Sequence, residues 1–325
     1  MMDDEQYTGL RERYRNFAEI ETRGSSALYS EMAARVSQSE ALLRLIARLP
    51  PAKQQPNLVF AATRRLFGTP ADAADFERTL LAHPEPIRAL ILARSTQSNE
   101  PGRCATLLPA MARLPEPLAI IEVGASAGLC LLPDRYAYDY GRASLRPDGA
   151  GPDTPVFPCR ASSDTPLPER MPRIVWRAGL DLSPVDLGDE EDVAWLQTLV
   201  WPGDDARAER LGQAVAVARR DPPEVVRGDL VDDLAALAAR APRDVTLVVF
   251  HTAVLAYVDA QKRDRFARLV ARLGAVWISN ESADVLPRVA ARLRTAPPPG
   301  HSVLAVNGEP VAVTHMHGLS IDWLA

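Results

Sequence analysis

The chain has 325 residues, 47% of them hydrophobic, which is enough for one large domain or two ordinary ones with a sizeable core. Its 37 basic and 42 acidic residues are interspersed and leave a formal charge of −5, which argues against a nucleic-acid-binding protein. Three cysteines without a close pair argue against a disulfide framework, and no stretch reaches the ~18 apolar residues of a membrane span. The acidic N-terminus lacks an apolar leader, so we expect a cytoplasmic protein that binds neither nucleic acid nor a membrane.

Residues 1–116 are expected to form an all-helical region. The stretches SALYSEMAARVSQSEALLRLIARL and NLVFAATRRLFG carry apolar residues at helical spacing. A Pro-Pro pair ends the first of these helices, and Gly68 follows the second as a C-terminal cap. Asp72 is expected to cap a third helix, and a fourth is expected to begin near Pro86.

From residue 117 onward, short β-type runs alternate with helical patterns. The β-type runs are LAIIEV, RIVWRAGLDL, PEVVRGD, VTLVVF, AVWIS, SVLAV and PVAVT. This alternation predicts an α/β domain over residues 117–325 with a mainly parallel sheet covered on both faces. The last two runs flank Asn307-Gly308, so we expect the sheet to end in an antiparallel hairpin strand. Residues 139–172 are rich in Pro, Gly, Asp and Ser and are expected to form an insertion, with a small hairpin made from YAYDY and VFPC.

The stretch IIEVGASAGLC places two glycines directly after the first predicted strand. At this position Gly124 lets the chain leave the strand sharply, and Gly128 lets a helix begin close to the sheet with its free N–H groups toward a ligand. The spacing is not that of the dinucleotide fingerprint, because Ala125 or Ser126 stands where the middle glycine belongs. The acidic Glu122 suits a cationic ligand better than a phosphate.

This stretch resembles motif I of the class I S-adenosylmethionine-dependent methyltransferases, whose loop wraps the methionine part of the cofactor. The resemblance implies that the cofactor is contacted by Glu122, Gly124, Ala125, Ser126 and Gly128. AGLDLSP resembles the second motif of that family, which implies that Asp181 binds the ribose hydroxyls. VRGDL resembles the third, which implies that Asp229 accepts a hydrogen bond from the adenine amino group.

LVVFHTAVLAYV resembles the family's fourth strand and the loop that leads to the reacting methyl group, with His251 at the strand's end. The final hairpin resembles its sixth and seventh strands. Together these likenesses imply a Rossmann-like, seven-stranded methyltransferase sheet. The insertion places Asp181 beyond the family's usual spacing, so Asp139 remains an alternative ribose ligand.

His251 is the candidate general base, because a neutral imidazole with a pKa near ~6.5 can accept a proton from an oxygen or nitrogen nucleophile. The alternative is a strand-end histidine that is only held in place by hydrogen bonds. Tyr257 either lines the same pocket or packs. In ISNES, Asn280 and Glu281 end another strand at the edge where ligands bind, although a satisfied loop turn is the favoured interpretation of them.

The polar stretch STQSNEPGR lies between two predicted helices just before the sheet. It predicts substrate-binding side chains on a helical lid, namely Gln97, Asn99 and Arg103, with Glu100 beside them. The alternative is a capped helix–helix connection.

Two further pairs of residues, two histidines and two tryptophans, have structural interpretations. His315 and His317 lack a third ligand, so no metal site is predicted, and Trp195 and Trp201 are expected to pack rather than stack on adenine.

The whole chain also resembles a bacterial family known as domain-of-unknown-function family 2332. The likeness lies in EVGASAGL, DRYAYDYG, WRAGLDLSPVD, VVRGDL, VVFHTAVLAY and TQSNEPGR, and it implies no established activity. The leading hypothesis is therefore methyl transfer from S-adenosylmethionine to a small-molecule acceptor. The alternatives are a non-catalytic cofactor-binding or scaffold protein on the same fold and a nicotinamide oxidoreductase, which the glycine spacing disfavours.

Overall fold

The computed structural model describes residues 7–22, 25–97 and 99–324. The chain divides into a helical unit, Met1–Ser98 with Ala194–Glu209, and a sheet unit, Asn99–Val193 with Arg210–Ala325. The division therefore falls at residue 98 rather than near 116, because the segment that begins at Asn99 bonds to the loop after the first strand.

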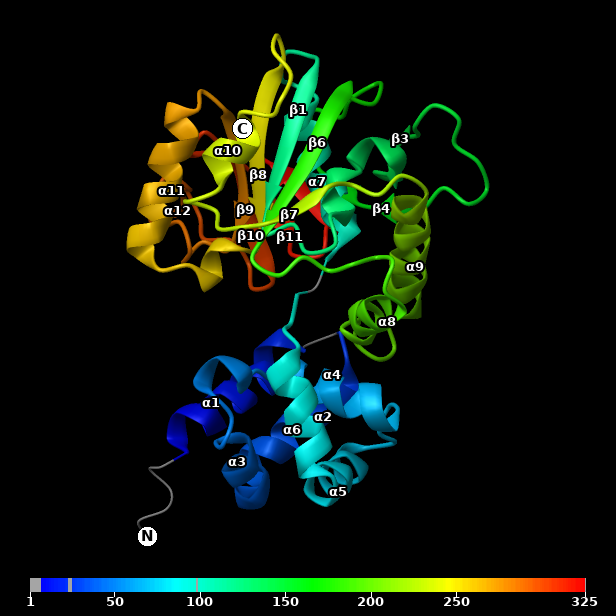
Figure 1. Ribbon diagram of the computed structural model, residues 1–325, viewed down its shortest axis with the longest axis vertical. Helices are drawn as coiled ribbons and strands as arrows, with labels where there is room; N and C mark the ends of the chain where they lie inside the picture. The colour runs from blue at the N-terminus through cyan, green and yellow to red at the C-terminus, as the bar shows by residue number, and fades with distance from the viewer. Residues whose placement is uncertain (1–6, 23–24, 98, 325) are drawn as a thin grey trace. The chain divides into compact units, whose positions relative to one another are not determined.

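The helical unit is built from short helices (Figure 1). Their buried side chains form an aromatic core. Its helices are α1 (Thr8–Asn16), η1 (Phe17–Glu21), α2 (Ala27–Gln38), α3 (Glu40–Ile46), η2 (Pro51–Lys53), α4 (Pro56–Phe67), α5 (Ala73–Ala82) and α6 (Pro84–Ala93). Phe60 lies at the centre of this core, with Tyr14, Phe17, Tyr29 and Phe76 against its ring edge-on. The core also contains Trp195, with Trp201 packed against it, as the packing interpretation of these tryptophans predicted.

Local signals set most helix boundaries in this unit. Gly68 follows α4 with a φ of 82°, and the Asp72 side chain accepts a hydrogen bond from the Asp75 N–H, so both predicted caps are confirmed. The single helix predicted before the Pro-Pro pair is instead two, α2 and α3. Ser39 separates them, because its backbone is extended and its hydroxyl caps the second helix at the Leu42 N–H.

The sheet unit contains a nine-stranded mixed sheet in the order β5-β12-β11-β10-β9-β8-β1-β6-β7. Its strands are β1 (Leu118–Val123), β5 (Arg160–Ala161), β6 (Ile174–Asp181), β7 (Val225–Arg227), β8 (Thr246–Thr252), β9 (Val276–Glu281), β10 (His301–Val306), β11 (Glu309–His315) and β12 (Ser320–Trp323). The sheet unit also contains the α-helices α7 (Cys104–Met111), α10 (Leu234–Ala238), α11 (Ala260–Arg272) and α12 (Pro287–Ala290), and the short 3-10 helices η3 (Pro101–Arg103), η4 (Leu129–Leu131), η5 (Pro133–Arg135) and η6 (Leu255–Tyr257). Two further helices, α8 (Glu190–Thr198) and α9 (Asp205–Arg220), each contain residues of both units.

Five neighbouring strands, β7, β6, β1, β8 and β9, are parallel. Numbered by their order in the chain they run 3-2-1-4-5, so the winding reverses between β1 and β8, where ligands bind in open α/β sheets. β1 is buried along its whole length, which explains its unbroken apolar run. The prediction of a large, mostly parallel sheet is confirmed.

Three details of the sheet differ from expectation. It has nine strands rather than seven, because β5 and β12 are too short to appear as β-type runs in the sequence. It ends in a meander of three antiparallel pairings, β9-β10, β10-β11 and β11-β12. The insertion contains β2 (Ala137–Asp139), β3 (Ser144–Leu145) and β4 (Val156–Pro158), and β2 pairs with β4 in parallel rather than as a hairpin.

No α-helix follows the glycine turn in the described chain between β1 and β6. Gly128 leads into the short turns η4 and η5, and Pro133 opens the second of them. The chain then enters the small sheet of the insertion. Gly128 therefore precedes only the three-residue 3-10 helix η4, and the α-helix expected after it is absent from these described residues.

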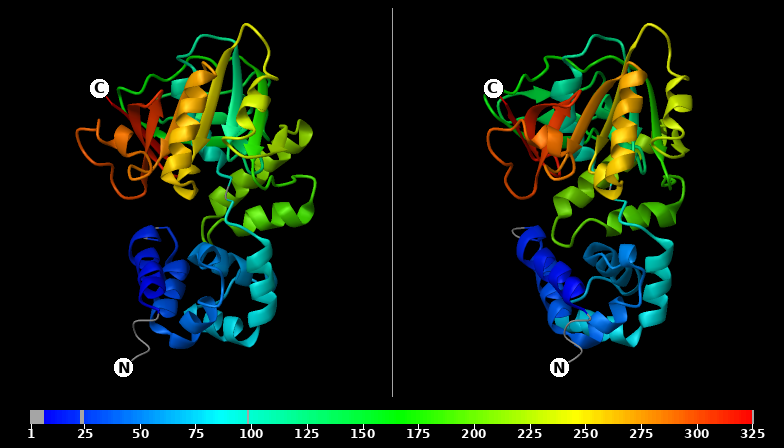
Figure 2. Two further views of the ribbon diagram at one scale, coloured as in Figure 1. Left: turned by 60° about the vertical axis from the view of Figure 1, so that its left-hand side comes forward. Right: turned by 90° about the vertical axis from the view of Figure 1, so that its left-hand side faces the viewer.

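The two faces of the parallel strands differ in what covers them. Side chains of β1, β6 and β8 such as Ile121, Leu180 and Val249 pack against α10 and α11. α11 lies along the strands in both views of Figure 2. Glu122 and Asp181 alternate with Ile121 and Leu180, so they belong to the opposite face.

Within the described part of the chain, no helix is both long and apolar enough to cross a membrane.

Candidate functional site

Polar side chains gather where the parallel strands end. We call this group the polar edge; it consists of Asn99, Glu100, Arg103, Glu122, Asp181, Thr252 and Asn280. All of its members except Arg103 are buried. Strand register brings Glu122 of β1 beside β6 and β8, and Thr252 of β8 beside Asn280 of β9. Buried carboxyl groups are costly unless they are paired or bind a ligand, so the polar edge is the candidate site.

The glycine turn is shaped by three left-handed residues, Gly124 at φ 70°, Ser126 at φ 52° and Gly128 at φ 72°. Asp181 holds this turn: its Oδ2 accepts the Ser126 N–H at 2.8 Å and its Oδ1 accepts the Ser183 N–H at 2.8 Å. The carboxylate at the end of β6 therefore contacts the loop after β1, as the motif order predicted.

Gly124 is tightly packed against the loop that follows β8. A Cβ atom at this position would lie 2.4 Å from Val254 Cγ2, so only glycine fits here. Ala253 just before it has a φ of 54°, which turns the loop back toward β1. The space directly beside Gly124 at the β1/β8 reversal is thus occupied by the Val254 side chain.

Glu122 is the most unusual member of the polar edge. It is 2% exposed, and its Oε2 has no hydrogen-bond partner among the described residues. Burial raises the pKa of this carboxyl well above its ordinary value. The neighbouring Cys130 thiol and the Asp181 carboxylate raise this pKa further, against the opposing Arg103 guanidinium. A buried carboxyl with an unsatisfied oxygen, next to the glycine turn, is the group that a cationic ligand would stabilise.

Asn99 and Arg103 connect the polar edge to its surroundings. The Asn99 amide donates to Ala125 O at 3.3 Å and accepts the Leu129 N–H at 2.7 Å, so it braces both sides of the glycine turn. Arg103 donates to the carbonyls of Met316 and Thr252 and to the Thr252 hydroxyl. These hydrogen bonds agree with both interpretations of this stretch, a structural connection and a ligand-binding segment. Gln97, the third predicted substrate-binding residue of this stretch, belongs to the helical unit instead.

His251 is fully buried on the α11 side of β8, the face opposite to Glu122. The Trp277 indole N–H, which can only donate, lies 3.0 Å from its Nε2, so Nε2 accepts. Nδ1 therefore carries the proton and donates to Glu281 Oε1 at 2.6 Å. Because both ring nitrogens are engaged inside the protein, this geometry gives no support to His251 as a general base and matches the alternative of a histidine held in place.

Glu281, the partner of His251, also holds the loop that follows β8. Besides His251, its Oε1 accepts the backbone N–H groups of Val254 and Leu255 at 2.9 and 3.0 Å. Glu281 thereby fixes the loop that presses Val254 onto Gly124. Its position at the end of a strand was visible in the sequence, but its contact with His251, 30 residues away along the chain, was not.

The remaining predicted residues lie in other environments. Asp229 pairs with the Lys262 ammonium at 2.5 Å and accepts the Val231 N–H at 2.8 Å. Partial burial opposes the charged form, but Lys262 and these N–H groups prevail and lower the pKa of Asp229. The Tyr257 side chain is 73% exposed on η6. Asp139 is exposed and caps its own turn at Gly141, so Asp181 is the better-placed of the two ribose candidates.

The histidine pair ends β11 rather than lying on one strand face. His315 is the last strand residue, and the His317 N–H donates back to its Nδ1 at 3.2 Å across a turn. His317 also lies 3.8 Å from Glu100. In the described ranges no three or more His, Cys, Asp and Glu side chains are arranged to hold a metal ion.

A family model described as an uncharacterized protein conserved in bacteria (DUF2332) matches residues 11–323. The chain belongs to this family. The matched range includes residues of both the helical unit and the sheet unit. Comparisons with curated proteins and with solved structures found no match.

Proposed function

We propose that the sheet unit binds S-adenosylmethionine at the polar edge and transfers its methyl group to a small-molecule acceptor. The observation that carries this proposal is Glu122, a buried carboxyl with one unpartnered oxygen beside a glycine turn at the strand reversal. A cationic ligand at this point would pair with that oxygen. The motif order, which resembles that of class I methyltransferases, supports the same ligand.

The carboxyl groups at the polar edge fit the cofactor. Glu122 would hold its positively charged methionine end, and Asp181 would accept hydrogen bonds from the ribose diol. The Gly124–Gly128 backbone would approach the cofactor between them. Because Val254 lies against Gly124, binding requires the loop of residues 253–255 to shift. When bound, the cofactor supplies an electrophilic methyl group on a sulfonium.

The chain's own contribution to catalysis would then be positioning and exclusion of water. With His251 enclosed, no side chain of β8 is offered as a base, so the acceptor would have to be nucleophilic without help from this histidine. The same enclosure favours the second candidate, a non-catalytic protein that binds the cofactor on this fold. Formation of S-adenosylhomocysteine during incubation with candidate acceptors distinguishes the two.

Calorimetric titration of the full chain with S-adenosylmethionine, S-adenosylhomocysteine and NAD tests the binding. We expect S-adenosylmethionine to bind and NAD not to. Asp181→Asn should weaken binding by about 1–3 kcal/mol, the cost of a hydrogen bond to a charged group, while the matched Asp139→Asn leaves binding unchanged. If Asp139→Asn weakened binding and Asp181→Asn did not, the ribose contact would be assigned to Asp139 in the insertion instead.

The raised pKa of Glu122 provides a second readout in the same titration. A cation favours the ionised carboxylate, so binding should release a proton, and affinity should rise from acidic toward neutral pH. Titrations in buffers of different ionisation enthalpy measure this proton. Glu122→Gln should abolish its release, and Val254→Ala should tighten binding by removing the side chain beside Gly124. Binding without proton release would contradict the assignment of Glu122.

A further inference from the structure

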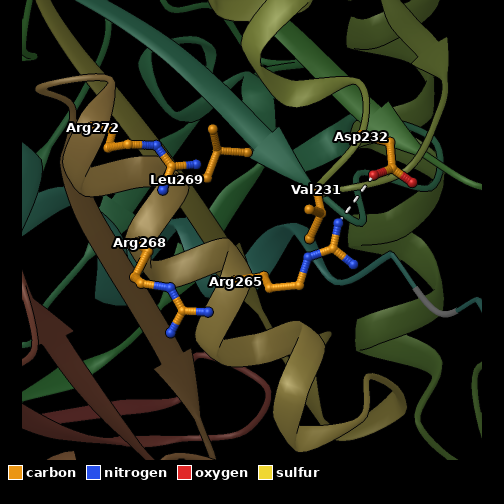
Figure 3. A pocket seen from close by; sticks show the side chains of 6 residues that line it. All are labelled: Val231, Asp232, Arg265, Arg268, Leu269 and Arg272. Atoms are coloured by element: carbon orange, nitrogen blue, oxygen red, sulfur yellow. Dashed lines mark ion pairs between the residues drawn. The ribbon is translucent and has the colours of Figure 1, made fainter.

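The outer surface of the sheet unit carries a hollow lined by three arginines (Figure 3). Its volume is about 470 Å³, and its lining consists of Val231, Asp232, Arg265, Arg268, Leu269 and Arg272. We call it the arginine hollow. This volume falls within the ~300–1,000 Å³ that is usual for small-molecule sites.

The arginines come from one stripe of α11. Positions 265, 268 and 272 are three and four residues apart, which places successive side chains on the same helix face with Cβ atoms ~5–6 Å apart. All three are exposed. Figure 3 shows Arg265 directed toward Asp232 in the loop after β7, with Arg268 and Arg272 farther along the helix. The hollow thus presents a row of guanidinium groups.

This row is not neutralised by its surroundings. α11 carries five basic residues and one acidic residue in a chain whose net charge is −5. Lys262 pairs with Asp229, and Arg263 donates to the carbonyls of Val258 and Val285. Neither Arg268 nor Arg272 has an ion pair among the described residues.

The third arginine of the row, Arg265, has an ion pair, but a weak one. Arg265 lies 3.5 Å from Asp232, and both side chains are largely exposed. Like charges three and four residues apart destabilise a helix, and the helix dipole compensates only Arg272 in the last turn. An anion in the hollow would relieve the repulsion among all three.

We propose that the arginine hollow binds a small molecule carrying a diphosphate or triphosphate chain. Guanidinium forks pair bidentately with phosphate oxygens, and a linear row of them matches a chain of phosphates better than a single one. Val231 and Leu269 provide apolar surface in the lining for the organic part of such a molecule. Asp232 opposes an anion and limits its affinity. This site is separate from the polar edge and does not depend on the function proposed for it.

Titration of the full chain at low salt with tripolyphosphate, diphosphate, orthophosphate and citrate tests the proposal. We expect tripolyphosphate to bind one-to-one and at least about tenfold more tightly than orthophosphate or citrate. Citrate binding as tight as that of tripolyphosphate would overturn the phosphate assignment. Absence of saturable binding would overturn the site itself.

Variants on the surface locate the binding. Arg268→Ala and Arg272→Ala should each weaken tripolyphosphate by about tenfold. Arg220→Ala, which removes an exposed arginine at the end of α9, should leave it unchanged. Asp232→Asn should tighten it, because it removes the one carboxylate of the lining. Equal weakening by Arg220→Ala would show general charge attraction, and weaker binding by Asp232→Asn would show that the anion does not lie beside this carboxylate. Either result would contradict the proposal.

Discussion

The helical unit and the sheet unit bury different chemistry. Among the described residues of the helical unit, the buried polar side chains are uncharged: Thr22, Ser26, Ser37 and Thr63. The buried carboxyl groups lie in the sheet unit: Glu100, Glu122, Asp181 and Glu281. Ionisable groups are costly to bury, whereas aromatic packing needs no partner beyond shape. The core of the first unit therefore contributes stability, and the buried carboxyl groups of the second are the basis of the ligand binding that we propose.

The largest expected effect is in the helical unit. Phe60→Ala removes the ring at the centre of the aromatic core and should lower the free energy of unfolding by about 3–5 kcal/mol. Phe67→Ala, at the exposed end of the same helix, is the matched control and should cost far less. Urea denaturation measures both. If Phe60→Ala weakened ligand binding by the folded protein, the assignment of stability alone to this core would fail.

A smaller effect is expected at Glu281. Glu281→Gln keeps an oxygen for the Val254 and Leu255 N–H groups but replaces a charged acceptor of the His251 proton by a neutral one. The free energy of unfolding should fall by about 1–3 kcal/mol. Glu309→Gln, on an exposed glutamate of β11, should change it little. Equal stability of the two variants would show that the buried pair contributes nothing.

The smallest effect concerns the pH dependence that Glu122 imparts. Its pKa is raised in the folded protein, so the folded state binds more protons than the unfolded state above the ordinary pKa of 4.5. Wild-type stability should therefore fall relative to Glu122→Gln as pH rises above that value, by at most about 1.4 kcal/mol per pH unit. Denaturation curves over a pH series measure the difference. Parallel pH profiles for the two proteins would contradict the raised pKa.

The sequence predicts those parts of the fold that local patterns determine. β1 was visible because a strand buried on both faces is an apolar run, and β6 and β8 were visible because their second halves are buried and largely apolar. The β10–β11 hairpin was visible because Asn307 and Gly308 both adopt the positive φ that its turn requires. The two-residue β5 has no such signal. The sequence did not show that an α-helix is missing after Gly128, because the apolar residues there, Leu129 to Leu131, are buried in the short η4 as they would be in a helix.

The candidate site was predictable only where strand order determines it. Asp181 and Gly124 end adjacent parallel strands, so their proximity follows from the topology. The side to which a residue at a strand end points is decided by one residue of register, and this separates His251 from Glu122. Val254 against Gly124 and Glu281 against His251 are contacts between distant loops and strands. Nothing in the local sequence encodes them.

The insertion has a consequence for the behaviour of the protein in solution. Its strand β5 pairs in parallel with β12 and covers the last strand of the meander. Arg160 adds two hydrogen bonds of 3.1 Å to Asp322 across this pairing. An uncovered strand offers its unpaired N–H and C=O groups to another molecule and so promotes aggregation, whereas a two-residue cover with a charged side chain discourages such docking. A shortened protein that lacks residues 139–172 would therefore be prone to self-association through β12, even with its polar edge intact.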